Sequence, residues 1–465
     1  MKETKFKQTE VGLIPNDWEV KKIGELYKVH NGLSKGKQFF GHGYPFLSFS
    51  VVFNNVFIPN KLENLVDSSK EERASYSINK GDVFITRTSE TVDELGMSCV
   101  ALKDYPNATY NGFCKRLRPN DVEFVNLGYL GFYLRSDFIR EWFLKFSTVT
   151  TRASLKNDEL LSLPLVLPPT IEEQQRIANA LSDVDTLINN LEKLIAKKKN
   201  IKQGAMQQLL TGRKRLPGFG LDNGHTDWFT PNGVHEKSIK TAKVVRPESI
   251  RVKDKEQCAG FKMTELGLIP TDWEVKTISQ VGKIIGGGTP STFNSAYWNG
   301  SVQWFTPAEL SKAGKYVSKS ERTITKQGVE NCSAKILPAG TILLTTRASI
   351  GTSAILKAPA CTNQGFQSLV VNSENSNEFL YYLLSTKVDE MMSLASGSTF
   401  LEISPKKLGG IQLQIPSSRA EQTAIANVLS DMDTEIATLE TKLAKYRKLK
   451  TGMMQQLLTG KIRLV

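Results

Sequence analysis

The sequence predicts an α+β fold with two globular α/β domains and two long helices whose coiled-coil seams can pair with each other, in a pseudo-two-fold internal repeat. Three observations predict it. The heptapeptide "MQQLLTG" occurs at Met206–Gly212 and again at Met454–Gly460, and a chance repeat of seven letters is improbable. Two globular stretches mix short β-branched and aromatic runs with Gly, Pro and Asn. Each is followed by a long proline-free stretch with heptad spacing.

The repeat extends well beyond the heptapeptide. Glu173–Asp185 recurs as Glu421–Asp433, and Gly12–Val20 recurs as Gly267–Val275. The chain is therefore a tandem duplication whose ends match closely while each middle has drifted apart. This pattern predicts a first globular domain, a central helix, a flexible linker, a second globular domain and a distal helix, at residues 1–169, 170–212, 213–262, 263–416 and 417–465. Phe219, Trp228 and Phe229 predict that parts of the linker pack against something.

The globular parts contain recognisable strands and helices. Gly81–Thr86 and Gly340–Thr345 are typical of buried strands entered from a turn, and Glu378–Lys387 is typical of a short helix. We expect the tryptophans to belong to the cores rather than to a binding surface; these are Trp18, Trp273 and Trp304.

The helices begin after proline-containing segments, with Thr170 and Ser417 or Ser418 as expected N-caps, and both end in Thr-Gly, where glycine suits the C′ position. Both have apolar residues spaced 4, 3, 4, 3, 4, which is an a/d seam: Ile177, Leu181, Val184, Ile188, Leu191 and Ile195 in the first, and Ile425, Leu429, Met432, Ile436, Leu439 and Leu443 in the second. The alternative is an amphipathic helix lying on its own domain. A helix of about 40 residues is roughly 60 Å long, which exceeds the width of such a domain.

Composition limits the class of partner. The formal net charge is +13 and the pI is about 9.3, which suits a polyanion, although solvated lysines would give the same balance. The five cysteines and four histidines show no metal-ligand spacing, so we expect no metal site and buried free thiols in a reducing compartment. The N-terminus lacks an apolar signal segment and no run approaches the roughly 18 apolar residues of a membrane span, so we expect a cytoplasmic protein without membrane contact.

Signatures of catalysis are missing from the sequence. It has no Gly-x-x-x-x-Gly-Lys phosphate loop, and the run Gly286–Pro290 lacks the G-x-G-x-x-G spacing, so a glycine turn accounts for it better than a nucleotide site. Amino-methylating enzymes place Asn or Asp before Pro-Pro-aromatic, and Leu167–Thr170 offers neither the polar residue nor the aromatic. The chain is therefore predicted to be a binder without a catalytic site.

Several motifs together resemble the specificity (S) subunit of Type I restriction–modification systems. They are the "GLIPNDWEV" and "GLIPTDWEV" segments, "GGGTPSTFNSAYWNGSVQWFTP", the Glu-Gln-x-x-Ile-Ala helix starts and the "QQLLTG" helix ends. The resemblance covers essentially the whole chain, and the elements occur in the family's order, mostly twice. The first domain departs from it, because Asn31–Gly36 stands where the second has Gly-Gly-Thr-Pro-Ser, and the Tyr-Trp element is missing.

The resemblance implies a DNA-binding subunit without catalysis of its own. Each target-recognition domain would read one half of a split, asymmetric site in double-stranded DNA. The two helices would pair as an antiparallel coiled coil that separates the domains. They would also dock two modification (methyltransferase) subunits, which restriction (translocase/endonuclease) subunits join. Those partners would bind S-adenosylmethionine and ATP, so no cofactor is expected here. Two alternatives stay open: a specificity chain that serves a fused methyltransferase–nuclease, and a coiled-coil scaffold without DNA function.

Candidate DNA contacts are polar residues that follow predicted strands or lie in the loops beside them, because phosphates need cations and small donors while base edges favour Arg, Lys, Asn and Gln. For each one a solvated loop residue is the alternative. Arg87 and Arg347 stand out, since both repeats place Thr-Arg after the same strand. The full set is Ser34, Lys35, Lys37, Gln38, Arg87, Thr88, Ser89, Lys115 and Arg116 in the first domain, and Thr289, Ser291, Thr292, Arg347, Ser349, Asn363, Gln364 and Gln367 in the second.

Overall fold

The structure is a computed structural model that describes residues 5–89, 95–121, 125–146, 148–149, 153–220, 260–347, 349–397 and 401–465. Contacts divide the chain into two compact units. The first unit contains Met1–Leu194 and Leu439–Val465, and the second contains Ile195–Thr438. The ranges expected from the sequence treat each long helix as a separate segment, whereas here each unit takes part of both helices.

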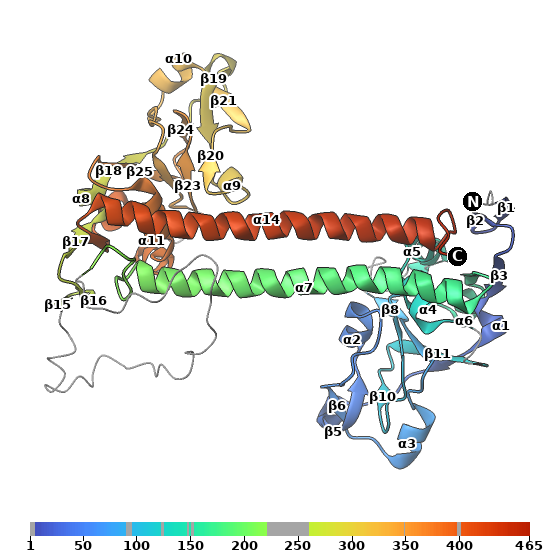
Figure 1. The fold of residues 1–465 in the computed structure, drawn as a ribbon. Coiled ribbons are helices and arrows are strands. Elements are labelled where there is room, and N and C mark those ends of the chain that lie inside the picture. The colour runs from blue at the N-terminus through green and yellow to red at the C-terminus, as the bar shows by residue number, and fades with distance from the viewer. Residues whose placement is uncertain are drawn as a thin grey trace, which may run out of the picture. The chain divides into compact units, whose positions relative to one another are not determined.

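The first unit contains the first globular domain (Figure 1). Its elements are β1 (Phe6–Thr9), β2 (Gly12–Pro15), β3 (Glu19–Lys22), α1 (Ile23–Leu26), β4 (Tyr27–Asn31), η1 (Lys37–Phe39), β5 (Phe40–Leu47), α2 (Phe49–Asn54), β6 (Leu65–Val66), α3 (Lys70–Ser75), β7 (Val83–Thr86), β8 (Thr88–Ser89), β9 (Ser98–Val100), β10 (Thr109–Tyr110), β11 (Cys114–Pro119), α4 (Leu127–Tyr133), α5 (Asp137–Phe146), β12 (Thr148–Val149), β13 (Ala153–Ser154), α6 (Asn157–Leu161) and β14 (Pro164–Leu167).

The second unit contains the second globular domain. Its elements are β15 (Phe261–Thr264), β16 (Gly267–Pro270), β17 (Trp273–Thr277), α8 (Ile278–Val281), β18 (Gly282–Gly286), η5 (Ser295–Tyr297), β19 (Trp298–Phe305), α9 (Pro307–Leu310), β20 (Tyr316–Val317), β21 (Arg322–Ile324), α10 (Lys326–Glu330), β22 (Ile342–Leu344), β23 (Ser353–Leu356), β24 (Cys361–Thr362), β25 (Gln367–Val371), α11 (Asn377–Ser385), α12 (Val388–Leu394), α13 (Pro405–Gly409) and β26 (Gln412–Pro416). The long helices are α7 (Ile171–Leu209) and α14 (Arg419–Leu457).

The two domains share a sheet topology even where their sequences have drifted. The order β4-β11-β7-β9 in the first corresponds to β18-β25-β22-β23 in the second, where β20 adds a further strand. The smaller sheets correspond as well, since β10-β5-β6 matches β24-β19-β21, with a parallel and an antiparallel pairing in each. The strands expected at Gly81–Thr86 and Gly340–Thr345 are found as β7 and β22, and the expected helix at Glu378–Lys387 is found as α11.

The last strand of each domain pairs with one of its first. β14 runs antiparallel to β3, and β26 runs antiparallel to β17, so each domain returns to its own beginning just before its long helix starts. This closure places the "DWEV" segment beside the start of the helix. The tryptophans of these segments, Trp18 and Trp273, are fully buried, and Trp304 is buried too, as expected for core residues.

The structure describes both ends of the expected linker at 213–262. Leu216 is buried and Phe219 packs against the core of the second unit, as an aromatic residue in this segment suggested. At the other end, β15 begins at Phe261, because Phe261 and Lys262 pair with Pro270 and Ile269. Trp228 and Phe229 lie outside the described residues.

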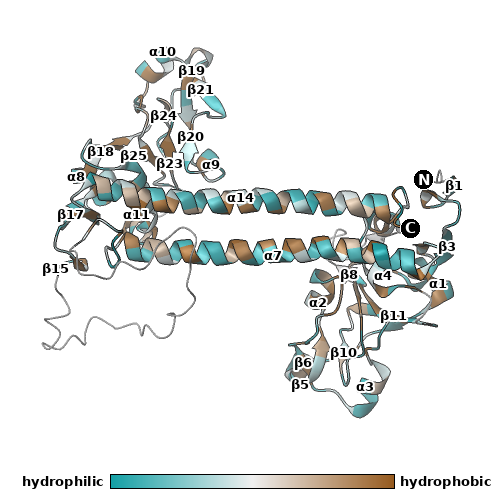
Figure 2. Cartoon of the chain, viewed as in Figure 1, coloured by the Kyte–Doolittle hydropathy of each residue, from teal (hydrophilic) through white to brown (hydrophobic). Residues whose placement is uncertain are grey.

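The long helices pack against each other in both units. In the second unit Lys198 pairs with Glu435 and Lys202 with Asp433, and in the first Asp185 pairs with Lys450 and Glu192 with Arg447. Residue numbers rise along one helix as they fall along the other, so the pairing is antiparallel. Figure 2 shows polar and apolar residues alternating along both helices. All six expected seam residues of α7 are buried, while Met432 and Leu439 in α14 are half-buried.

The seam contributes more to stability than the ion pairs do. A buried Leu or Ile side chain contributes about 1.5–3 kcal/mol relative to an exposed one, whereas an exposed ion pair contributes about 0.2–1 kcal/mol. The ion pairs between the helices are partly exposed, and their opposite charges favour the antiparallel register. The expected helix ends are also present. The Thr170 hydroxyl accepts the Glu173 amide at 3.2 Å, and Ser418 directly precedes α14.

Each "LLTG" helix end packs on the globular domain of the other repeat. Gly460, after α14, has a φ of 69°, and a Cβ there would lie 2.5 Å from Pro15 and 3.1 Å from Trp18. Gly212, after α7, has a φ of 67°, and a Cβ there would lie 2.6 Å from Pro270. Glycine is required at both positions because the backbone is left-handed and the neighbouring rings are in contact.

An arginine three residues beyond each of these glycines closes the junction. Arg463 donates to both oxygens of the Glu173 carboxylate and donates to Asp17 at 3.0 and 3.1 Å. In the second unit, Arg215 donates to Glu421 at 2.5 and 2.8 Å and to Asp272 at 2.8 and 2.7 Å. We call these two sites the arginine junctions. Each joins the end of one long helix to the start of the other helix and to the "DWEV" segment.

Within the junctions, the pKa of an arginine is raised and the pKa of a carboxylate is lowered, as expected for ion pairs. The hydrogen bond to Glu173, followed by that to Asp17, raises the pKa of Arg463. The hydrogen bond from Arg215 holds the pKa of Asp272 below its usual value. Because Glu173 and Glu421 are buried, the arginine supplies the charge that each carboxylate needs away from water.

We predict that Arg215→Met lowers the free energy of unfolding by about 3 kcal/mol, because Glu421 is only 1% exposed and would lose its cation. Urea unfolding of the full chain measures this, with the exposed Arg213→Met as the control. Asp272 has a depressed folded pKa, so its contribution is present above its unfolded pKa of about 3.9 and is lost as the pH falls below it. The difference from wild type should therefore shrink in acid. Equal losses in both variants would contradict the assignment.

Candidate nucleic-acid interface

Arg87 and Arg347 occupy equivalent positions in the two domains, directly after strands β7 and β22. The Arg87 amide donates to the Phe113 carbonyl, and the Arg87 carbonyl accepts the Leu155 amide. Arg347 forms an isolated antiparallel bridge with Glu402, and the neighbouring Thr346 carbonyl accepts the Ile403 amide. Both arginines are thus held between the central sheet and the segment that precedes α6 or α13.

The two guanidinium groups retain unused donors. Among the residues that the structure describes, the buried Nε atoms of Arg87 and Arg347 have no hydrogen-bond partner. Arg347 also pairs with Glu402 at 2.7 Å, and its side chain is 42% exposed. An arginine whose backbone is fixed and whose guanidinium group is partly exposed, as that of Arg347 is, can bind a phosphate or a guanine edge.

In the second domain the structure brings several of the expected contact residues together. The Thr289 hydroxyl donates to the Gln364 amide oxygen, and the Asn363 side chain accepts the Gly365 amide at 2.9 Å. The Thr346 amide donates to the Gly365 carbonyl, which places this loop beside Arg347. Gln367 lies opposite Gly286 where β25 pairs with β18. Ser291 and Thr292 are exposed just beyond Thr289, and Ser349 is half-buried, its carbonyl accepting the Thr345 hydroxyl.

The glycine turn expected at Gly286–Pro290 is wrong. The three glycines, Gly286–Gly288, show why. These residues have no left-handed φ and continue from β18 without a turn. Glycine is needed here for close approach instead, because a Cβ on Gly287 would lie 1.9 Å from the Asn363 carbonyl oxygen. The Gly288 carbonyl in turn accepts the indole N–H of Trp304 at 2.8 Å. The run therefore fixes the loop that follows against the Asn363–Gln364 loop.

The corresponding loop of the first domain is anchored by Lys35. Its ammonium pairs with Glu72 at 2.7 Å, donates to the Asp67 carbonyl at 2.7 Å and lies 4.9 Å from the centre of the Phe39 ring. The hydrogen bond from Lys35 lowers the pKa of Glu72. Lys35 thus holds the loop, while Ser34, Lys37 and Gln38 are exposed beside it. Thr88 and Ser89 form β8, and their side chains lie outside the described residues.

Lys115 and Arg116 are buried, which removes them from the residues that we propose as DNA contacts. The Lys115 ammonium donates to Asn157, and burial, followed by repulsion from Arg87, lowers its pKa. Arg116 is 3% exposed, and its guanidinium donates to the Ser77 carbonyl at 2.7 Å and to the Ser75 carbonyl at 3.4 Å.

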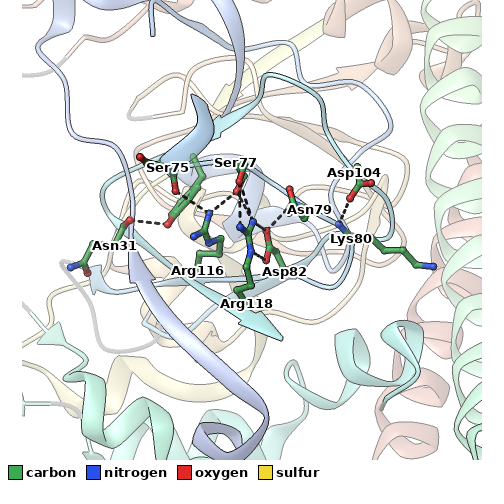
Figure 3. A network of polar contacts seen from close by, with 10 residues as sticks. Asn31, Ser75, Ser77, Asn79, Lys80, Asp82, Asp104, Arg116 and Arg118 are labelled. Carbon is green, nitrogen blue, oxygen red and sulfur yellow. Dashed lines mark hydrogen bonds and ion pairs between the residues drawn. The ribbon is translucent and has the colours of Figure 1, made fainter. Parts of the chain in front are cut away.

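A network around Asp82 explains the burial of Arg116. Figure 3 shows Arg116 and Arg118 converging on Ser77, with Asp82 beside Arg118. Arg118 forms a bidentate pair with Asp82 at 2.8 and 2.6 Å, and the Asp82 hydrogen bond raises the pKa of Arg118. These charged strand residues face a buried polar network, so they support the sheet rather than a binding surface.

Sequence reasoning missed one conspicuous residue. Phe293, in the loop after Ser291, has a fully exposed side chain, at 101% of the reference value. The loop around it is ordered, since the Trp298 indole donates to the Ser291 carbonyl at 3.1 Å and the Asn294 side chain accepts the Ala296 amide. The available signal in the sequence was an aromatic residue among small polar ones.

Most of the described cysteines are buried and have no sign of reactivity or metal binding. Cys99, Cys114 and Cys361 are buried free thiols, and burial raises the pKa of each to about 12. Cys332 is also a free thiol but is only half-buried, so the expected burial is wrong for this residue. Cys258 lies outside the described residues. Within the described ranges no group of His, Cys, Asp and Glu has the arrangement of a metal site. No described helix is long and apolar enough to cross a membrane.

Comparison with known proteins gives a consistent result. A family model described as "Type I restriction modification DNA specificity domain" matches residues 15–203 and 270–446. The MjaIX specificity subunit of Methanocaldococcus jannaschii is 44% identical over 176 residues, which is 37% of this chain and 40% of that protein. The putative MjaX specificity subunit of the same organism is 28% identical over 99% of this chain and 97% of its own length. The crystal structure of the S subunit from M. genitalium shares the fold, with a TM-score of 0.53, 15% identity and coverage of 95% of this chain and 96% of that one.

We predict that Arg116→Met lowers the free energy of unfolding by about 2 kcal/mol, because the Ser75 and Ser77 carbonyls lose their donor. Nucleic-acid affinity of the folded variant should stay as in wild type. Chemical denaturation and a DNA-binding titration measure the two effects, with the exposed Lys37→Met as the control for stability. A variant as stable as wild type but defective in binding would return Arg116 to the interface.

Proposed function

This chain belongs to the family of Type I restriction modification DNA specificity proteins, and from that membership we propose that it is the sequence-specific DNA-binding subunit of a Type I restriction–modification complex. It recognises a bipartite, asymmetric target in double-stranded DNA, and one globular domain reads each half. It carries no catalytic site. Two modification subunits and the restriction subunits assemble on it, and they bind the S-adenosylmethionine and ATP. This chain itself needs no cofactor, and it works in the cytoplasm, where its DNA target is.

The observation that carries the proposal is the double match to a DNA specificity domain, once over each repeat. Both domains have the same sheet topology, yet their loops carry different side chains. Such a pair suits a target whose two halves differ in sequence. The relatives described above are named as specificity subunits, which favours separate modification and restriction subunits over a fused methyltransferase–nuclease. The family match in both repeats also argues against a scaffold without DNA function.

We propose that DNA lies against the strand-end loops of each domain. In the second domain the contacts are Arg347 and Ser349, the loop of Thr289, Ser291 and Thr292, and the side chains of Asn363, Gln364 and Gln367. In the first domain they are Arg87, Thr88 and Ser89 together with Ser34, Lys37 and Gln38, while Lys35 positions its loop through Glu72. Phe293 adds an apolar contact, because an exposed ring can meet a thymine methyl or the face of a base.

Methyl transfer tests the proposed function. The purified chain alone should incorporate no labelled methyl group into DNA, since it has no catalytic site. Addition of the modification subunit from the same system should give methylation at one bipartite sequence, and the modification subunit alone should give none at that sequence. Methyl incorporation by the rigorously pure chain would overturn the proposal. So would methylation of the same bipartite sequence by the modification subunit without this chain.

Arg347→Ala should cost about 1–3 kcal/mol of DNA-binding free energy. It should relax one base position of a single half-site if Arg347 reads guanine, or weaken binding uniformly if it meets phosphate. Arg87→Ala should act in the same way on the other half-site. Methylation of targets varied one base at a time measures both, with the exposed Arg419→Ala as the control. Normal folding with unchanged affinity and unchanged specificity would assign both arginines a structural role.

A further inference from the structure

The N-terminal hairpin of each repeat has the same register and nearly the same sequence. β1 and β2 read "FKQTEVGLIP" through their turn, and β15 and β16 read "FKMTELGLIP". Phe6 pairs with Pro15 and Gln8 with Leu13 in the first hairpin, and Phe261 pairs with Pro270 and Met263 with Leu268 in the second. The left-handed glycines of the two turns, Gly12 and Gly267, also correspond.

Each hairpin has an inner face and an outer face. Side chains alternate along a strand, and directly opposed residues share a face. Ile14 and Ile269 belong to the inner face and are buried in their domains. The outer face carries Leu13, which is 55% exposed, and Leu268, which is 39% exposed. Phe6 in one hairpin and Met263 in the other extend the same exposed apolar surface. The exposed Glu10 and Glu265 lie in the turns beside it.

The exposed leucine is repeated although the fold does not require it. Leu13 and Leu268 occupy equivalent positions of the two repeats, and an exposed leucine adds little to a core. Exposed apolar residues are not repeated as a rule, since Leu187 and Leu194 of α7 correspond to Glu435 and Lys442 of α14. The strand-end loops have drifted apart between the repeats. A surface that stays the same in both is suited to a partner that both repeats meet.

We propose that the outer face of each hairpin docks one modification subunit, with Leu13 or Leu268 at the centre of the contact. This inference rests on the proposed function, in which that subunit is present twice. An apolar side chain with polar residues at its edge, here Glu10 or Glu265, is the usual composition of a protein interface. Because the two hairpins belong to different units, each unit offers one such site.

The test uses the full chain with Leu13→Ser, Leu268→Ser, and both changes together, mixed with the purified modification subunit. Native mass spectrometry and sedimentation velocity measure how many subunits bind and how tightly. Wild type should bind two. Each single variant should bind one normally and the second roughly tenfold more weakly, and the double variant should weaken both sites. Leu102→Ser, in the first domain at an exposed position that is not repeated, is the matched control and should bind two normally.

A second measurement keeps the test independent of folding. A photoreactive phenylalanine analogue at position 13 or 268 should cross-link to the modification subunit, and the same analogue at position 102 should not. Two full-affinity subunits on the double variant, or cross-linking from position 102 alone, would overturn the inference. A wild-type chain that binds no modification subunit would instead refute the proposed function, so the two failures are distinguishable.

Discussion

The arginine junctions are the constraint on which the rest of the structure depends. Arg463 neutralises the buried Glu173, and Arg215 neutralises the buried Glu421. A buried carboxylate without a cation is strongly destabilising, so each long helix can end only where the other begins. This explains why "MQQLLTG" is written twice. The heptapeptide ends a helix at a left-handed glycine that fits against Pro15 and Trp18, or against Pro270 and its neighbour Trp273.

The junctions explain which parts of the chain are alike in the two repeats and which parts differ. Residues that make the junction, the seam and the hairpins are alike in the two repeats because each contacts an equivalent structure. The strand-end loops make no such contact, so their sequences can differ between the repeats as long as the sheet beneath them keeps its topology. Arg87 and Arg347 mark the boundary, since their backbones belong to the shared framework and their side chains to the variable surface. A framework of this kind can hold different recognition loops in two domains without a change of fold.

Local pattern predicted much of the fold. The heptad seam, the strands β7 and β22 and the buried tryptophans follow from spacing and from the cost of exposing apolar surface. The junctions could not be predicted in this way, because Arg463 meets Asp17 across almost the whole chain and no local window contains both. Lys115 and Arg116 failed as surface candidates for the same reason. Their partners Asn157 and Ser77 come from distant segments, and only the folded sheet shows that the charges are buried. The set of DNA contacts remains a prediction.

Hydrogen exchange measured by mass spectrometry on Arg463→Met tests the central claim most directly. Arg463 is near the end of the second repeat, but its partners Asp17 and Glu173 belong to the first. Amides around Trp18 and at the start of α7 should therefore exchange faster than in wild type, while those of 261–416 keep their protection. Faster exchange in the second domain, with the first unchanged, would contradict the crossed junction. So would an exchange pattern identical to that of wild type.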